Sequence, residues 1–249
     1  MRPAYSSHDA TTLSNAMKRA TMGRTMMRAK LFYLAKRNPG CAAKDWPKLW
    51  RSHARFVGRF PSVGGSLDWL NYCARVLDRP VPGATTDYDG AAVIAGASHD
   101  AMTPRLSPED HVLLLDDERR VFSTVVEDFM FRARETLVHG GDTGEFAVLR
   151  FIARAPGVTS EDFRRRWHGP HAARSIAAAD AGAVKRYVQN DLTETPPPGF
   201  AFDAISETWF DTLDDAVAGF AVGAPAEGEH DPARSVTLLS HPIYRWPRV

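Results

Sequence analysis

The sequence predicts an α+β protein built from two tandem repeats with the element order βαββαβ, packed sheet to sheet into one α/β barrel within the chain. Two observations lead to this prediction. The chain has 249 residues, of which 44% are apolar, so it can bury a sizeable core in one or two domains. The same sequence patterns also occur twice, in the same order and at a nearly constant separation, which is typical of an internal repeat.

Composition and charge exclude several classes of protein. The 31 Lys and Arg residues nearly balance the 30 Asp and Glu residues, for a net charge of +1, which argues against a nucleic-acid partner and against a disordered chain. The sequence has no apolar run of about 18 residues, so we expect no membrane-spanning segment. Its two cysteines, Cys41 and Cys73, are too few for a disulfide framework or a structural zinc site. These features favour a cytoplasmic location.

The repeat is visible in five pairs of residues. Segments 31–40 and 148–157 each read as a strand that runs into a Pro-Gly turn, and a helix with two aromatic residues follows each turn. The matched pairs are Pro39 with Pro156, Trp46 with Phe163, Trp50 with Trp167, Tyr72 with Tyr187, and Asp89 with Asp203. Their separation falls slowly from 117 to 114 positions. We therefore predict a first repeat at 30–138, a second at 145–249, and a flexible arm at 1–29.

The second repeat shows the expected elements in order. Residues 145–154 are rich in Phe, Val, Leu and Ile, which favours a strand. The hydroxyl group of Thr159 and the acidic residues after it are typical of a helix start. This helix should reach Asp180 with an interruption near Pro170. Residues 184–192 suit a second strand.

A Pro-rich loop at 194–199 separates this strand from a third strand at 202–210. A short amphipathic helix at 212–220 follows, and the sequence predicts that the last strand, at 235–246, is broken by Pro242. This order is that of the ferredoxin-like plait. Because one plait leaves one face of its sheet uncovered, two copies can place these faces together and close a barrel. Two independent domains are the alternative, which the short connection between the repeats disfavours.

A helical face of the second repeat carries a candidate catalytic histidine. Phe163, Trp167 and His171 recur at a spacing of four and therefore face the same way on a helix, whereas His168 points elsewhere. A histidine at the end of an aromatic face can be tuned for proton transfer near neutral pH. An inert histidine that caps the kink is the other interpretation.

Two strands supply candidate partners for this histidine. In the third predicted strand, alternation places Glu207 on one face with Trp209. Because burial disfavours an ionised carboxyl group, Glu207 is a candidate acid or base, or a residue that orients a histidine. A salt bridge at a sheet edge is the alternative role. In the second predicted strand, either Tyr187 or Asn190 could hold a substrate oxygen.

Motifs for cofactors and metals are missing from the sequence. It contains no Gly-rich phosphate loop, no HExxH or CxxC motif and no nucleophile elbow, each of which would indicate a specific chemistry. The histidines do not show the spacing of metal ligands. We therefore predict no metal and no cofactor.

A resemblance to a known family rests on three segments of the second repeat. They are an F-x-x-x-W-x-x-x-H helix, an R-Y-V-Q-N strand and a D-x-x-x-E-x-W-F strand, which begin at Phe163, Arg186 and Asp203. In this order they resemble the EthD family, a branch of the dimeric α/β-barrel proteins, over most of 145–249. The resemblance implies a barrel fold and a small-molecule site. The superfamily includes cofactor-free monooxygenases, cyclases, decarboxylases, dehydratases and haem-handling enzymes, so fold alone does not fix the reaction.

The first repeat resembles the same family less closely. Its His53 follows the second tryptophan one residue earlier than the family pattern requires, and Val93 stands at the position of Glu207. The small residues around Val93 indicate a packed wall or space for a ligand. We therefore expect one working site, in the second repeat, and the sequence leaves open whether His53, Tyr72 and His99 contribute.

These observations lead to one main functional prediction and two alternatives. The main one is a cofactor-free, lyase-type enzyme that dehydrates, cyclises or decarboxylates a hydrophobic, oxygen-bearing molecule of aromatic or polyketide type. In it His171 would be the general acid or base, and Glu207 would orient it or share its proton. The expected substrate-binding residues are Trp167, His168, Tyr187, Asn190 and Trp209. The alternatives are a cofactor-independent monooxygenase of a phenol or quinol and a non-catalytic binding protein, and a homodimer is compatible with all three.

Overall fold

The computed structural model describes residues 28–64 and 67–247. The predicted arm at 1–29 lies outside these residues, apart from its last two positions. The first half of the described chain forms β1 (Ala29–Ala35), α2 (Trp46–Val57), α3 (Pro61–Gly64), β2 (Leu67–Arg75), β3 (Gly90–Gly96), α4 (His99–Met102), α5 (Pro108–Val121), the 3₁₀ turn η1 (Val126–Phe129) and β4 (Met130–Gly140). The second half forms β5 (Phe146–Ile152), α6 (Ser160–Arg166), the π turn η2 (Trp167–His171), α7 (Ala172–Asp180), β6 (Arg186–Leu192), β7 (Ala204–Phe210), α8 (Leu213–Ala218) and β8 (Val236–Trp246).

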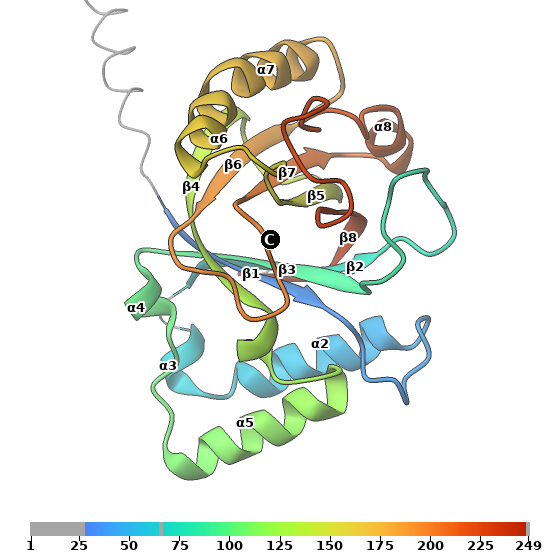
Figure 1. Cartoon of the computed structure of the whole chain (residues 1–249). Coiled ribbons are helices and arrows are strands. Elements are labelled where there is room, and N and C mark those ends of the chain that lie inside the picture. The colour runs from blue at the N-terminus through green and yellow to red at the C-terminus, as the bar shows by residue number, and fades with distance from the viewer. Residues whose placement is uncertain (1–27, 65–66, 248–249) are drawn as a thin grey trace, which may run out of the picture.

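The eight strands close into one barrel in the order β1-β3-β2-β8-β5-β7-β6-β4, with antiparallel pairing throughout. Within each half the order is the same, β4-β1-β3-β2 and β8-β5-β7-β6, and β2 with β8 and β4 with β6 join the halves. Figure 1 shows α2 and α5 on one side of the barrel and α6, α7 and α8 on the opposite side. The predicted α+β fold, with two ferredoxin-like repeats in one intramolecular barrel, is confirmed.

Two arginine–aspartate contacts show how closely the halves correspond. The guanidinium group and the backbone N–H of Arg37 both donate to the carboxylate of Asp89, and Arg154 binds Asp203 in the same way. Each arginine Nε also donates to the carbonyl group four residues further on, at 2.9 and 3.0 Å. Each pair ties the end of the first strand of a repeat to the start of its third strand.

The helix predicted from Thr159 to Asp180 forms and is interrupted at the proline, as expected. The Thr159 side chain accepts a hydrogen bond from the Asp162 N–H and caps α6. The π turn η2 follows and contains Pro170, because a proline has no N–H with which to continue the α-helical ladder. The chain then resumes a regular helix as α7, which ends at Asp180.

The last strand differs from the prediction. β8 is continuous through Pro242, so the expected break is wrong. Pro242 pairs with Cys73 and Tyr244 pairs with Tyr72, which leaves Ile243 as an extra residue in β8 at this register shift. An irregularity of this kind accommodates a proline because the ladder requires no hydrogen bond from it.

Side chains from both repeats fill the barrel and form a packed core. They are Phe32, Leu34, Cys73, Ala91, Val93, Phe131, Ala133, Ala147, Leu149, Phe151, Phe202, Ile205, Trp209 and Leu238. Val93 and its small neighbours therefore form a packed wall, one of the two roles that the sequence allowed. Outside the first sheet, Gly90 gives room to two tryptophans of α2. A Cβ atom added at Gly90 would lie 2.7 Å from Trp50 and 2.9 Å from Trp46.

Candidate active site

The inside of the barrel contains a buried ionic network that joins the two repeats. Lys30 Nζ of β1 lies 2.8 Å from Glu207 Oε1 of β7 and 2.8 Å from Glu135 Oε2 of β4. The Asn190 amide donates to Glu207 Oε1 at 3.1 Å, and the Trp209 indole donates to Glu207 Oε2 at 3.0 Å. Lys30 and Glu207 are both fully buried. Glu207 is therefore held by three donors and balances a buried cation.

The sheet separates Glu207 from His171, although the sequence predicted that they work together. Val188 is the cross-strand partner of Glu207, and Tyr187 is that of Thr208. Because neighbouring residues of a strand face opposite ways, Glu207 points into the barrel while Tyr187 points towards the helices. His171 Nε2 lies 2.9 Å from the Tyr187 hydroxyl oxygen. The expected pairing of His171 with Glu207 is thus corrected, because the two side chains lie on opposite faces of the sheet.

His171 belongs to a packed polar cluster between the second sheet and its helices. Its ring stacks on that of Trp167, with centroids 4.5 Å apart, and is almost fully buried. Burial lowers the pKa of His171 to about 4 and raises the pKa of Tyr187. On the same face of the sheet, the buried Arg150 donates hydrogen bonds to two backbone carbonyl groups of the loop after α8. Burial lowers the pKa of Arg150 to about 10.

The other predicted site residues lie apart from this cluster. Asn190 and Trp209 belong to the network inside the barrel. His168 is exposed, and its Nε2 lies 3.0 Å from a carboxylate oxygen of Asp191, a contact that raises the pKa of His168. The structure therefore does not bring the predicted catalytic and binding residues into one site.

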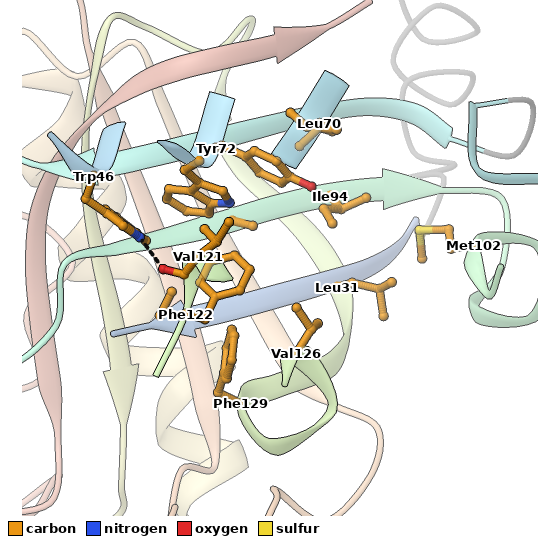
Figure 2. Close-up of a cluster of buried hydrophobic side chains, with 14 residues drawn as sticks. Leu31, Trp46, Leu70, Tyr72, Ile94, Met102, Val121, Phe122, Val126 and Phe129 are labelled. Atoms are coloured by element: carbon orange, nitrogen blue, oxygen red, sulfur yellow. Dashed lines mark hydrogen bonds between the residues drawn. The ribbon is translucent and has the colours of Figure 1, made fainter. Parts of the chain in front are cut away.

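A cavity of about 510 Å³ lies in the first repeat, between the sheet and helices α2 and α5. Its walls are mostly apolar, and Figure 2 shows part of them. The labelled wall residues are Leu31, Leu70, Tyr72, Ile94, Met102 and Val126. A cavity of this size and character suits a small hydrophobic molecule. The structure thus places a ligand-sized cavity in the repeat that the sequence predicted to lack a working site.

One wall of the cavity includes His53, which pairs with an aspartate behind it. His53 of α2 is buried, and its Nδ1 lies 2.7 Å from Oδ2 of Asp117 on α5. Burial acts to raise the pKa of Asp117, but hydrogen bonds from His53 and Arg120 outweigh burial and lower it. Because an ionised Asp117 can only accept, Nδ1 donates to it, and Nε2 of a neutral His53 is left as a proton acceptor.

Further polar side chains line the same cavity, among them Tyr33, Tyr72 and Glu118. The hydroxyl groups of Tyr33 and Tyr72 form no hydrogen bond with any residue that the structure describes, and burial raises the pKa of both phenols. Glu118 follows Asp117 on α5, and its Oε2 accepts a hydrogen bond from the Val126 N–H at 2.8 Å. Burial raises the pKa of Glu118, whereas that of Asp117 is lowered. The pKa values of these two consecutive carboxyl groups are therefore shifted in opposite directions.

Helix geometry accounts for the different spacing of the two histidines. The helix α2 is regular, and His53 follows Trp50 by three residues. In the second repeat the π turn widens the helix, so His171 follows Trp167 by four residues and still lies on the buried side. Both histidines are buried. The extra residue therefore belongs to the π turn, and the earlier position of His53 still places it on the buried side of α2.

The described residues form neither a metal-binding cluster nor a membrane-spanning helix. Within residues 28–64 and 67–247, no three His, Cys, Asp or Glu side chains are grouped so as to hold a metal ion. In that part of the chain, no helix has the length and apolar character needed to cross a membrane.

A barrel closed by two ferredoxin-like halves defines the class of dimeric α/β-barrel folds, and solved structures support this class. An anthrone oxidase-like protein is 13% identical over 89% of this chain and 93% of its own, with a TM-score of 0.57. A putative monooxygenase from Fusobacterium nucleatum is 7% identical over 88% and 93%, with a TM-score of 0.51. A mutant chlorite dismutase from Candidatus Nitrospira defluvii is 8% identical over 87% and 92%, with a TM-score of 0.50. At these identities the similarity shows the fold alone.

A match to a family model lies in the second repeat. Residues 155–227 match the EthD domain, a segment that begins in the turn before α6 and ends in the loop after α8. The resemblance of the second repeat to the EthD family, which the sequence predicted, is therefore confirmed over these residues. No curated protein matches the sequence.

Proposed function

We propose that this protein is an enzyme that holds a hydrophobic, oxygen-bearing small molecule in the cavity of the first repeat and transfers protons on it. One observation carries the proposal: the buried His53, held by a hydrogen bond to Asp117, lines an apolar cavity of about 510 Å³. Apolar pockets with a few convergent polar groups are the usual form of small-molecule sites. This assignment moves the acid–base role from His171 to His53 and keeps the predicted class of substrate.

The geometry supports His53 as a general base. Asp117 fixes the imidazole tautomer and stabilises the imidazolium that forms when Nε2 takes a proton. Tyr33 and Tyr72 keep their phenolic protons because burial raises their pKa. Their hydroxyl groups, which no described residue pairs with, can then donate hydrogen bonds to a substrate oxygen on which negative charge develops. The cavity therefore combines a base with two neutral donors, which suits proton abstraction next to a carbonyl group and hence a lyase-type reaction.

A cofactor-independent oxygenase is the second candidate. Two proteins with this fold support it: one is described as anthrone oxidase-like and the other as a putative monooxygenase. In such a reaction His53 would deprotonate a phenol, and the resulting anion would react with dioxygen. Consumption of oxygen with a phenol substrate distinguishes this candidate from the lyase-type reaction, which consumes none.

The test uses nitrobenzisoxazole, a hydrophobic probe that opens to a coloured nitrophenolate when a base removes one proton. We expect the protein to accelerate this opening, and His53→Ala to lower kcat/KM by about 10²-fold or more, the usual contribution of a general base. Asp117→Asn should lower it as well, because an amide can hold the wrong tautomer of the imidazole. Circular dichroism and thermal unfolding check that both variants fold.

Two results would contradict the proposal. If His53→Ala is folded and as active as the wild type, His53 is not the base. If His171→Ala alone abolishes the activity, the site is in the second repeat, as the sequence first suggested. A probe that binds in the cavity with no acceleration over free imidazole would instead identify a non-catalytic binding protein.

A further inference from the structure

Glu118 differs from the other buried carboxyl groups of the described chain. The buried carboxyl groups of the described chain are those of Asp89, Glu118, Glu135 and Glu207. Asp89 pairs with an arginine, and Glu135 and Glu207 share Lys30. Within residues 28–64 and 67–247, Glu118 forms no ion pair, and it lines the first-repeat cavity instead. A buried carboxylate without a cation is costly, so such a group is more stable in its neutral, protonated form.

The position of Glu118 suits a proton donor. The side chain lies on the inner side of α5 with 6% exposure. Its Oε2 is held by the Val126 N–H at 2.8 Å, which fixes the carboxyl group and leaves Oε1 available to a molecule in the cavity. Burial raises the pKa of Glu118, and the Val126 N–H together with the nearby His53 and His111 offsets only part of this effect. The cavity thus has a proton acceptor on α2 and a proton donor on α5.

We infer that Glu118 is the general acid of the cavity that it shares with His53, and that the substrate is a hydrophobic carbonyl compound with a hydroxyl group on the carbon β to the carbonyl. This inference rests on the proposed function. It narrows the lyase-type reaction to the elimination of water, because a base and an acid in one apolar cavity can remove a proton and assist a leaving oxygen at neighbouring carbons.

The elimination balances without an oxidant or a cofactor. His53 Nε2 takes the proton from the carbon next to the carbonyl group, and the electron pair of that C–H bond forms the new C=C bond. The C–O bond on the β carbon then breaks, and the leaving oxygen takes its electron pair and the proton of Glu118. The products are a conjugated enone and water. Transfer of a proton from the His53 imidazolium back to the Glu118 carboxylate, through solvent, restores the starting state.

A cationic ligand is the competing explanation for an unpaired carboxyl group in a cavity that also contains tyrosines. A carboxylate and aromatic rings together can bind an ammonium group. The buried position of Glu118 favours the acid, because burial disfavours the charged carboxylate that an ammonium group would need as its partner. Binding of benzylamine distinguishes the two explanations: we expect none, and binding that Glu118→Gln abolishes would overturn the inference.

The first experiment detects the proton of Glu118 directly, without any substrate. In Glu118→Gln the amide oxygen can still accept the Val126 hydrogen bond, but the side chain cannot carry an acidic proton. Infrared spectra taken over a pH series should show a protonated-carboxyl band in the wild type that persists above the titration of ordinary carboxyl groups. This band should be missing from Glu118→Gln and present in Glu127→Gln, a matched control at the exposed rim of the cavity. A wild type without such a band overturns the inference.

The second experiment measures the elimination with the aldol adduct of benzaldehyde and acetone, whose dehydration to benzalacetone is followed by absorbance. We expect Glu118→Gln to lower kcat by about 10²-fold, within the usual range for a general acid, and to remove the alkaline limb of the pH profile. Glu127→Gln should keep both. If the wild type opens nitrobenzisoxazole but does not dehydrate the adduct, or if Glu118→Gln dehydrates it normally, the inference fails and the proposed function stands. If neither probe reacts, both fail.

Discussion

The two repeats share a backbone plan but differ in what lies between the helices and the sheet. Each places a tryptophan, a histidine and a tyrosine at corresponding positions. In the second repeat His171 contacts Tyr187 at 2.9 Å, and Arg150 fills the space beside them. In the first repeat His53 turns to Asp117 at 2.7 Å, and a cavity lies between the helices and the sheet. The family signature therefore lies in the second repeat, whereas the space for a ligand lies in the first.

Two local features produce this difference. The position of Tyr33 in the first repeat corresponds to that of Arg150, 117 residues later, and the long guanidinium side chain reaches the loop after α8. The second helix of each repeat also differs in length, since α5 extends over 14 residues whereas α8 has 6. The longer helix α5 forms a second wall of the cavity and carries Asp117 and Glu118. The shorter α8 ends before the corresponding positions.

The largest expected effect comes from the network that holds the two repeats together. Lys30→Met leaves Glu207 buried without its cation, and breaking a buried ion pair in this way costs about 3–5 kcal/mol of unfolding free energy. Urea unfolding measures the loss. The double variant Lys30→Met/Glu207→Gln should recover most of it, because the remaining groups are then neutral or paired with Arg186. A single variant as stable as the wild type would show that the network does not join the repeats energetically.

A second prediction concerns the second repeat alone. Burial lowers the pKa of His171 to about 4 in the folded protein, below the value of about 6.5 expected for an unfolded chain. Because the unfolded chain binds the proton first as the pH falls, stability should decrease between about pH 6.5 and about pH 4, by roughly 3 kcal/mol for this group. Unfolding of wild type and His171→Gln over this range checks it. Identical slopes for the two proteins would mean that His171 is not buried in its neutral form.

A third prediction concerns Tyr33, which stands in the first repeat at the position of Arg150 in the second. Tyr33→Arg should give the first repeat a side chain like Arg150 and weaken the binding of nitrophenol by about tenfold, or about 1.4 kcal/mol, because the guanidinium group occupies the cavity. Calorimetric titration measures the change. Tyr33→Phe is the matched control: it keeps the shape and should lose only one hydrogen bond, worth about 1 kcal/mol. Equal binding by wild type and Tyr33→Arg would place the ligand elsewhere.

The smallest expected effect concerns the helix that covers the cavity. The Ser107 hydroxyl accepts the Asp110 N–H and caps α5, so Ser107→Ala should cost about 1 kcal/mol. Hydrogen exchange should become faster in α5 and stay unchanged in α6. Thr159→Ala, which removes the equivalent cap of α6, should give the reverse pattern. Faster exchange in both helices after either change would show that the two repeats do not open independently.

Much of the fold could be predicted from the sequence, because it depends on local and repeated patterns. The Pro-Gly turns, the aromatic pairs and the cap at Thr159 recur or act within a few residues, and they led to the repeat and to the barrel. The predicted break at Pro242 is wrong because a bulge depends on the register with a strand far away in the chain. The order of elements was therefore predictable, and the details of strand pairing were not.

The candidate site was harder to predict because its contacts are long-range. His53 and Asp117 are 64 residues apart, and Lys30 and Glu207 are 177 apart, so no motif connects them. The one local signal for Lys30 is its alternation with Phe32 and Leu34 on β1, which places it on an apolar face. Whether a space between helix and sheet is empty or filled depends on side-chain volumes from several elements, and spacing within one helix does not reveal it.

A crystal structure with bound nitrophenol, the kind of product that the probe reaction releases, tests the central claim most directly. We predict that the phenolic oxygen lies within hydrogen-bond distance of His53 Nε2 or of a tyrosine hydroxyl group, in the cavity between the first sheet, α2 and α5. Density for the ligand beside His171 and Tyr187, with the first-repeat cavity empty, would contradict the account.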